Sequence, residues 1–245
     1  MYTVEERDEV RRRVLALADA DARVVAGAVV GGLANGGGDR FSDLDLSFGV
    51  EGAEPRAVLD DWTRTLADGL GAVHLFDLPS RSSLYRVFLF PGGLQVDLSC
   101  TPAADFGARG PRFELLFGDA VERPFDAGPE PADVFGLAVH HALRARSCLE
   151  RGRVWAAAYW IDGVRASALE LACLARGLRP QHGRGLDELP AEVRGRFAGA
   201  FERSLEPEEL RRALAVAVDG LLAEAGPLGD PVAAELQALA AESSG

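Results

Sequence analysis

The sequence predicts an α+β fold with a strand-rich first half and a helical second half. Before residue 118, several short segments show the β-branched runs or the strict apolar alternation of strands. After residue 131, apolar residues instead recur at helical spacing. Between the halves, segment 123–131 contains three prolines and a glycine, which sustain neither regular structure. We therefore expect an interdomain linker there.

The first half predicts two helices and six strand-like segments. An amphipathic charged segment predicts the first helix, and Val58, Leu59, Trp62, Leu66 and Leu70 lie near helical spacing in the second. The expected helices cover 5–20 and 55–72, and the expected strands cover 23–30, 44–48, 73–76, 84–90, 94–100 and 113–117.

The second half predicts a bundle of successive amphipathic helices, with Gly or Pro residues between them. Such helices bury their apolar faces against one another, so a compact bundle is expected. The expected helices cover 133–151, 154–176, 191–204, 207–225 and 231–243.

The most informative stretch, 31–46, joins a glycine-rich loop to two closely spaced carboxylates. Asp43 and Asp45 stand two residues apart in an alternating, strand-like run, so both side chains face the same way while Leu44 and Leu46 face the core. Two neighbouring carboxylates repel unless a cation lies between them. Oxygen ligands of this kind suit Mg²⁺ or Mn²⁺.

A third carboxylate is expected at the same place. In segment 94–99, Leu94, Val96 and Leu98 alternate with polar residues, which places Asp97 on the polar face of a probable strand. If this strand lies beside the one that carries Asp45, three carboxylates converge. Two cations held by such a set could clamp a nucleoside triphosphate and activate a hydroxyl.

These residues resemble the motif of the polymerase-β-like nucleotidyltransferases, in particular the small enzymes that transfer a nucleoside monophosphate to an antibiotic hydroxyl. The family pattern is Gly followed by Gly or Ser, a loop of about ten residues, Asp-x-Asp between apolar residues, and a later strand Asp. The matching residues, in order, are Gly31, Gly32, Asp43, Asp45 and Asp97. An isolated Asp-x-Asp or glycine loop is a weak signal, and the joint spacing makes this match specific.

The resemblance implies roles for these residues. Asp43 and Asp45 would bind two Mg²⁺ ions, and Asp97 would bind the catalytic one and help to deprotonate the acceptor. Two departures concern the phosphate site, because many members have Ser at the position of Gly32 and Arg at that of Asn35. The residues expected to bind the β- and γ-phosphates of ATP or another triphosphate are Gly31, Gly32, Asn35, Arg40 and Ser42.

The resemblance also implies an architecture. We expect a nucleotidyltransferase catalytic domain over 1–127, built on a mixed five-stranded sheet with flanking helices. A helical acceptor-binding domain would follow over 128–245. The acceptor, a small hydroxylated molecule such as an aminoglycoside or lincosamide, would bind in the cleft between the two domains.

Candidates for acceptor binding lie in the helical half. By the resemblance, Asp162, Glu170 and Glu150 are candidates for a general base, although an i,i+3 ion pair with Arg165 also explains Asp162. His140 and Arg144 lie on one polar helical stripe, which is either a solvated face or a wall of the cleft. The aromatic residues that could stack on a substrate ring, or instead belong to the core, are Trp155, Tyr159 and Trp160.

Composition narrows the classes of partner. A formal net charge of −12 disfavours nucleic acid as a partner and favours a cationic acceptor. The chain has no lysine, which excludes a P-loop of the Gly-x-x-x-x-Gly-Lys type and Schiff-base chemistry. Three isolated cysteines favour the reducing cytoplasm, and the charged N-terminal segment resembles neither a signal peptide nor a membrane span.

Two other classes of function remain open from the sequence. One is a toxin-type nucleotidyltransferase that modifies a protein or an RNA. The other is a catalytically inactive relative that binds a nucleotide, which the departures at Gly32 and Asn35 favour. A homodimer is compatible with the sequence.

Overall fold

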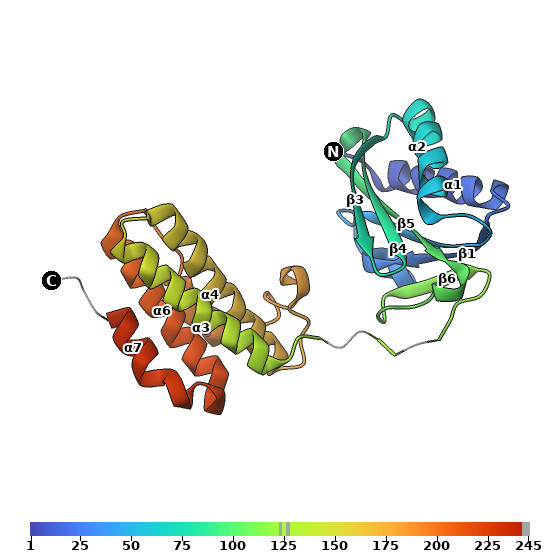
Figure 1. Ribbon diagram of the computed structural model, residues 1–245. Helices are drawn as coiled ribbons and strands as arrows, with labels where there is room; N and C mark the ends of the chain where they lie inside the picture. The colour runs from blue at the N-terminus through green and yellow to red at the C-terminus, as the bar shows by residue number, and fades with distance from the viewer. Residues whose placement is uncertain (123, 126–127, 242–245) are drawn as a thin grey trace. The chain divides into compact units, whose positions relative to one another are not determined.

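The computed structural model describes residues 1–122, 124–125 and 128–241 (Figure 1). The chain divides into two compact units, Met1–Ala127 and Gly128–Gly245, and each is described separately here. Residues 123, 126 and 127 of the expected linker lie outside the described residues, as do residues 242 and 243 of the last expected helix.

The first unit contains one mixed sheet of six strands in the order β3-β4-β5-β2-β1-β6. The expected α+β class is confirmed, but the expected count of five strands is wrong. The sixth strand arises because β3 pairs with β4 at one edge while β6 pairs with β1 at the other. The strands are β1 (Val24–Val30), β2 (Leu44–Val50), β3 (Val73–Ser80), β4 (Ser83–Phe90), β5 (Leu94–Pro102) and β6 (Phe113–Phe117).

Two helices, α1 (Val4–Ala20) and α2 (Pro55–Leu70), pack against one face of this sheet (Figure 1). A capping box between Thr3 and Glu6 starts α1, and Gly71 ends α2 in the left-handed conformation. The sheet residues that point toward these helices are fully buried, as the alternation predicted. They are Leu44, Leu46, Phe48, Val96 and Leu98.

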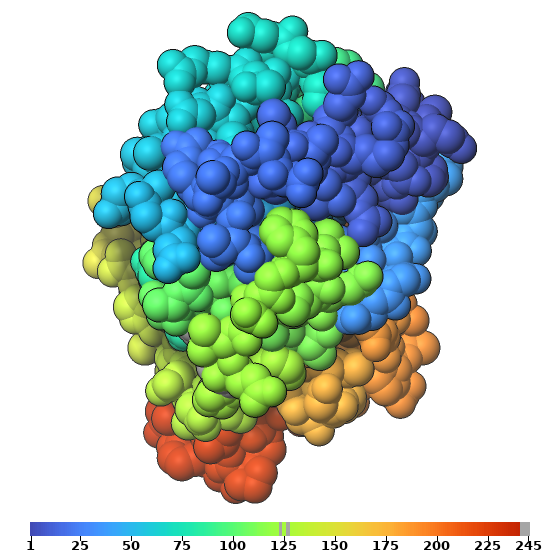
Figure 2. Space-filling model, turned by 90° about the vertical axis from the view of Figure 1, so that its right-hand side faces the viewer, coloured from blue at the N-terminus to red at the C-terminus, as the bar shows by residue number. Residues whose placement is uncertain are grey.

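The opposite face carries the polar residues of the central strands. Part of this face is covered by the segment between β5 and β6, where Phe106 is buried against Ala26 and Ala28 of β1. The backbone N–H of Val121 donates to the carbonyl of Phe106, which ties the chain after β6 to the same segment. Figure 2 shows this green segment at the surface, beside the blue N-terminal part of the unit.

The second unit is a helical bundle with its own apolar core. The expected helix over 191–204 is shorter than predicted, because the chain leaves the helix at Gly199 after Ala198. The helices are α3 (Pro131–Glu150), α4 (Val154–Leu174), α5 (Ala191–Ala198), α6 (Pro207–Ala225) and α7 (Ala233–Ala241). Among the described residues, no helix has the length and apolarity needed to cross a bilayer.

Candidate active site

The two central strands bring two of the expected carboxylates together. Strands β2 and β5 are parallel, and their register places Asp45 directly opposite Asp97. Paired residues on neighbouring strands project from the same face, so both carboxylates lie on the face that α1 and α2 do not cover. Both are half-buried, while their neighbours Leu44, Leu46, Val96 and Leu98 are fully buried on the other face.

Asp97 has a raised pKa, chiefly because burial penalises its charged form. The nearby charge of Asp43 raises the pKa further. Gln95 opposes both effects, since its Nε2 donates to Asp97 Oδ1 at 3.0 Å. A carboxylate in this environment is a better proton acceptor than an exposed one.

The donor set suits a hard divalent cation, because Asp43, Asp45 and Asp97 offer only carboxylate oxygens. A cation would also relieve the repulsion that raises the pKa of Asp97. Within the described part of the chain, however, no three acidic, His or Cys side chains already stand in a ligating cluster. The residues therefore fit a metal by their chemistry and register, and binding would have to draw the carboxylates closer together.

Gly31 lies against one of these carboxylates, at the end of β1. Its φ is +69°, and a Cβ at this position would lie 2.0 Å from Asp45 Oδ2. The Gly31 N–H donates to the carbonyl of Arg112 at 3.2 Å, which fixes the turn against the start of β6. Only glycine meets both demands, so the glycine of the motif is required by the close approach of the backbone to Asp45.

Ser42 closes the loop that leads into β2. Its hydroxyl accepts from the backbone N–H of Asp39 at 2.8 Å, and its carbonyl accepts from Tyr2 and from the buried Arg7 of α1. Gly32 lies nearby, since a Cβ there would be 3.5 Å from Ser42 Oγ. Arg40 is exposed, and its guanidinium stacks on the ring of Phe41.

Asn35 has a structural role in the glycine segment. It adopts the left-handed conformation with φ of 57°, which asparagine tolerates better than most residues. Its backbone N–H donates to Glu114 Oε2 at 2.7 Å, and its Nδ2 donates to the carbonyl of Pro111 at 3.3 Å. The side-chain amide is thus already engaged with the chain that precedes β6.

The proposed general bases of the second unit lie on α3 and α4. Asp162 is exposed and forms a close ion pair with the buried Arg165, as the i,i+3 spacing allows. Glu150 pairs with Arg146 at 3.1 Å. Glu170 is half-buried on α4.

His140 and Arg144 of the polar stripe form one cluster with the aromatic side chains of Trp160 and Tyr159. Trp160 lies at its centre, with the His140 ring 5.9 Å away edge-on and the Arg144 guanidinium 5.6 Å from the ring centroid. Trp155 and Tyr159 are 78% and 70% exposed, so they lie outside the core. The side chains of His140 and Arg144 are therefore held beside an aromatic surface that faces solvent on this unit.

The structure adds polar residues that the sequence analysis did not single out. Ser47 lies opposite Ser99, and the Ser99 hydroxyl donates to Ser47 Oγ at 2.8 Å. Both serines follow their carboxylates by two residues, in a repeated Asp-Leu-Ser that begins at Asp45 and at Asp97. That repeat could have revealed the serines, because residues two apart share a face of a strand.

Comparison with known proteins adds little to this picture. No protein-family model and no curated protein matches the chain. Among solved structures it is similar to an aminoglycoside 6-adenyltransferase from Bacillus subtilis, with 11% identity and a TM-score of 0.38 over 97% of this chain and 99% of that one. A likeness of that degree assigns no activity, so the functional assignment depends on the residues of the sheet face.

Proposed function

We propose that the chain is a Mg²⁺-dependent nucleotidyltransferase of the polymerase-β-like class, which transfers a nucleoside monophosphate, AMP in the simplest case, to a hydroxyl of a small molecule. The observation that carries this proposal is the parallel register that sets Asp45 opposite Asp97 on an open sheet face. The glycine turn packed on Asp45 supports it, because backbone N–H groups in such turns bind phosphate oxygens.

In the proposed reaction, the acceptor oxygen attacks the α-phosphorus and a new O–P bond forms. The bond from the α-phosphorus to the bridging oxygen of the β-phosphate breaks, and pyrophosphate leaves with that electron pair. Asp97 would take the proton of the acceptor hydroxyl, a role that its raised pKa suits. Mg²⁺, when bound by Asp43, Asp45 and Asp97, would neutralise charge on the phosphates.

The acceptor class follows from charge. A site with three carboxylates in a chain of net charge −12 attracts cations, so a hydroxylated and cationic acceptor such as an aminoglycoside or lincosamide suits it. Asp162 and Glu170 remain candidates for a general base in the helical half. The ion pair with Arg165 makes Asp162 the weaker candidate, because its charge is already compensated.

The test is pyrophosphate release from each of the four nucleoside triphosphates, with Mg²⁺ and a panel of hydroxylated antibiotics. We expect release by the wild type and none by Asp45→Asn. The exposed Asp68 on α2 provides a matched control, and Asp68→Asn should retain wild-type activity. Equal release by Asp45→Asn and the wild type would refute the assignment.

A second candidate function is that of a catalytically inactive relative of the nucleotidyltransferases, which binds a nucleotide without turnover. It is favoured by Asn35, whose amide is engaged by the Pro111 carbonyl, and by the lack of a ready ligand cluster among the described residues. Calorimetry with ATP and Mg²⁺ separates the two. Binding without turnover across all acceptors, including lysate proteins and RNA, would favour this candidate.

A further inference from the structure

A small polar pocket lies on the sheet face that carries Asp45 and Asp97, further along strands β2 and β5. Its volume is about 100 Å³, which is room for roughly three water molecules or one tetrahedral oxyanion. Ser47 and Ser99 line it, two residues or about 7 Å along the strands from Asp45 and Asp97. The other lining residues include Ser83, Thr101, Arg109 and Arg112.

The pocket is built around buried hydroxyl groups. Ser83, Ser99 and Thr101 are at most 4% exposed. The hydroxyls of Ser83 and Thr101 are hydrogen-bonded to each other at 2.6 Å, and Arg109 Nη2 donates to Ser83 Oγ at 2.9 Å. Since Ser99 donates to Ser47, the proton of the Ser47 hydroxyl has no acceptor in the described part of the chain.

Arg109 is a cation with no anionic partner among the residues that the structure describes. It is half-buried, and in the described residues Ser83 is its one hydrogen-bond acceptor and no carboxylate pairs with it. A partly desolvated guanidinium without a counter-charge is costly, and this chain has an excess of acids that could have paired with it. Arg112 also lines the pocket, and Asp105 is the one acidic residue among the described lining residues.

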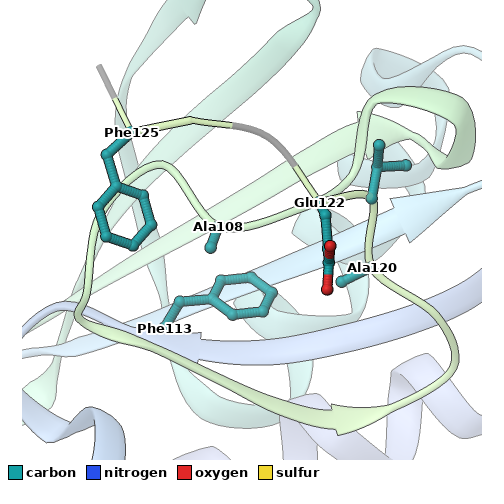
Figure 3. Close-up of a pocket in the computed structure, with 6 residues that line it drawn as sticks. Ala108, Phe113, Ala120, Glu122 and Phe125 are labelled. Atoms are coloured by element: carbon teal, nitrogen blue, oxygen red, sulfur yellow. The ribbon is translucent and has the colours of Figure 1, made fainter. Parts of the chain in front are cut away.

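A neighbouring hollow differs from the polar pocket in the residues that line it. It is about 500 Å³, shares Phe113 with the polar pocket, and is otherwise lined by small or apolar residues and Glu122. Figure 3 shows Phe113, Ala108 and Phe125 along one side of it, with Glu122 and Ala120 at the other. Among the described residues that line it, the one charged group is an acid, so none of them would attract an anion.

We infer that the polar pocket binds a phosphate-type oxyanion, with Arg109 as the principal ligand and Ser47 as a second donor. Under the proposed function, on which the identity of the ligand rests, the oxyanion is part of the triphosphate. Arg109 would then supply the positive charge that the glycine turn lacks, since Asn35 is neutral and Arg40 is stacked on Phe41. Arginine suits this role because its planar guanidinium donates two parallel hydrogen bonds to phosphate.

The test is calorimetric titration of the full chain with inorganic pyrophosphate and, in parallel, with ATP and adenosine, all with Mg²⁺. We expect Arg109→Gln to weaken binding of pyrophosphate and ATP about 10-fold, through loss of a charge-assisted contact, and to leave adenosine unaffected. Arg109→Lys should recover part of the loss. Arg13→Gln removes an equal charge from exposed α1 and should bind as the wild type does.

Pyrophosphate binding by Arg109→Gln at wild-type strength would overturn the inference, as would a wild type that binds adenosine but no pyrophosphate. The proposed function fails in a different way. A wild type without turnover whose pyrophosphate binding still depends on Arg109 would refute the transferase and keep the pocket. Turnover by the wild type, together with an unchanged KM for the triphosphate in Arg109→Gln, would keep the transferase and refute the pocket.

Discussion

At the scale of single residues, Asp97 combines a proposed chemical role with a cost to stability. A carboxyl group whose pKa is raised in the folded state binds its proton more tightly there than in the unfolded chain. Its contribution to stability is therefore favourable at low pH, and it becomes unfavourable as the pH rises through the folded-state pKa. Ionising Asp97 therefore costs the folded protein free energy.

Replacing this carboxyl group should separate the two effects. Asp97→Asn should abolish pyrophosphate release and raise the Tm of the metal-free protein at pH 7, because the amide carries no charge to desolvate. The difference in Tm should shrink as the pH falls below about 4, the unfolded pKa of an aspartate, because the carboxyl group is then protonated in both states. Thermal melts at several pH values measure this. A variant less stable than the wild type at pH 7 would contradict the burial of the charge.

Gly31 offers a second test at this scale, with Gly36 as its matched control. Both residues have φ near +70°, but a Cβ at Gly31 would collide with Asp45 Oδ2, whereas none of the described atoms lies within 4 Å of one at Gly36. Each change to Ala should therefore cost about 1 kcal/mol of backbone strain. Gly31→Ala alone should lose activity, and similar activity losses in both variants would show that strain explains the effect.

At the scale of elements, ionic networks link α1 and α2 to the neighbouring parts of the first unit. The buried Arg86 of β4 donates to Asp77 of β3 at 2.6 Å and to Asp60 of α2 at 2.8 Å. The guanidinium of Arg86 lowers the pKa of Asp77. A second network joins Asp21, which follows α1, to Arg23 and to the indole of Trp62 on α2.

The first network predicts a large cost for one substitution. Asp77→Ala leaves the guanidinium of Arg86, which is 3% exposed, with the exposed carboxylate of Asp60 as its remaining anionic partner among the described residues, beside the Thr63 hydroxyl. We expect a loss of about 3 kcal/mol in the free energy of unfolding, measured by urea denaturation. The exposed pairs of Glu9 with Arg12 and Arg13 are the control, and Glu9→Ala should cost about 0.5 kcal/mol or less. Equal costs would contradict the burial of the network.

The second network predicts a pH dependence. Hydrogen bonds from Arg23 lower the pKa of Asp21 to about 2. A depressed carboxyl pKa gives stability that is present above the unfolded pKa of about 4 and is lost as the pH falls toward 2. Asp21→Asn should thus be less stable than the wild type at pH 7, by about 1–2 kcal/mol, and equally stable near pH 2. A constant difference across this range, seen in urea titrations, would exclude the charge as its cause.

The sequence predicted most of the elements, because apolar periodicity records which face of each segment is buried. It placed Asp45 and Asp97 on strands and Asp43 just before one, while the proximity of Asp45 and Asp97 depended on the β2–β5 register, which local patterns do not encode. All six strand-like segments form strands, whereas the five-stranded sheet implied by the family resemblance was one strand short, because pairing at a sheet edge depends on tertiary contacts. Arg109 was missed since it lies in an irregular connection without periodicity.

At the scale of the whole molecule, each unit has its own apolar core. One cluster draws on residues 10–100 and another on residues 134–236. Separate cores predict separate unfolding, because destabilising one core leaves the contacts within the other intact. The acidic charge of the whole chain should keep it from nucleic acids at physiological salt.

Differential scanning calorimetry tests the independence of the units. Phe197 on α5 is 2% exposed and contacts the backbone of Gly220 on α6 so closely that a Cβ there would lie 2.4 Å from its ring. Phe197→Ala should cost about 3–4 kcal/mol and lower the melting temperature of one of two transitions. A single transition that shifts as a whole would show that the two units unfold cooperatively.

The measurement that tests the central claim most directly is mass spectrometry of acceptors after incubation with the full chain, Mg²⁺ and each nucleoside triphosphate. The wild type should add the mass of one nucleoside monophosphate to a hydroxylated, cationic acceptor. Asp45→Asn and Asp97→Asn should leave that acceptor unmodified while folding as the wild type does. A modified acceptor in either variant at the wild-type rate would contradict the assignment of the sheet-face carboxylates as the site of transfer.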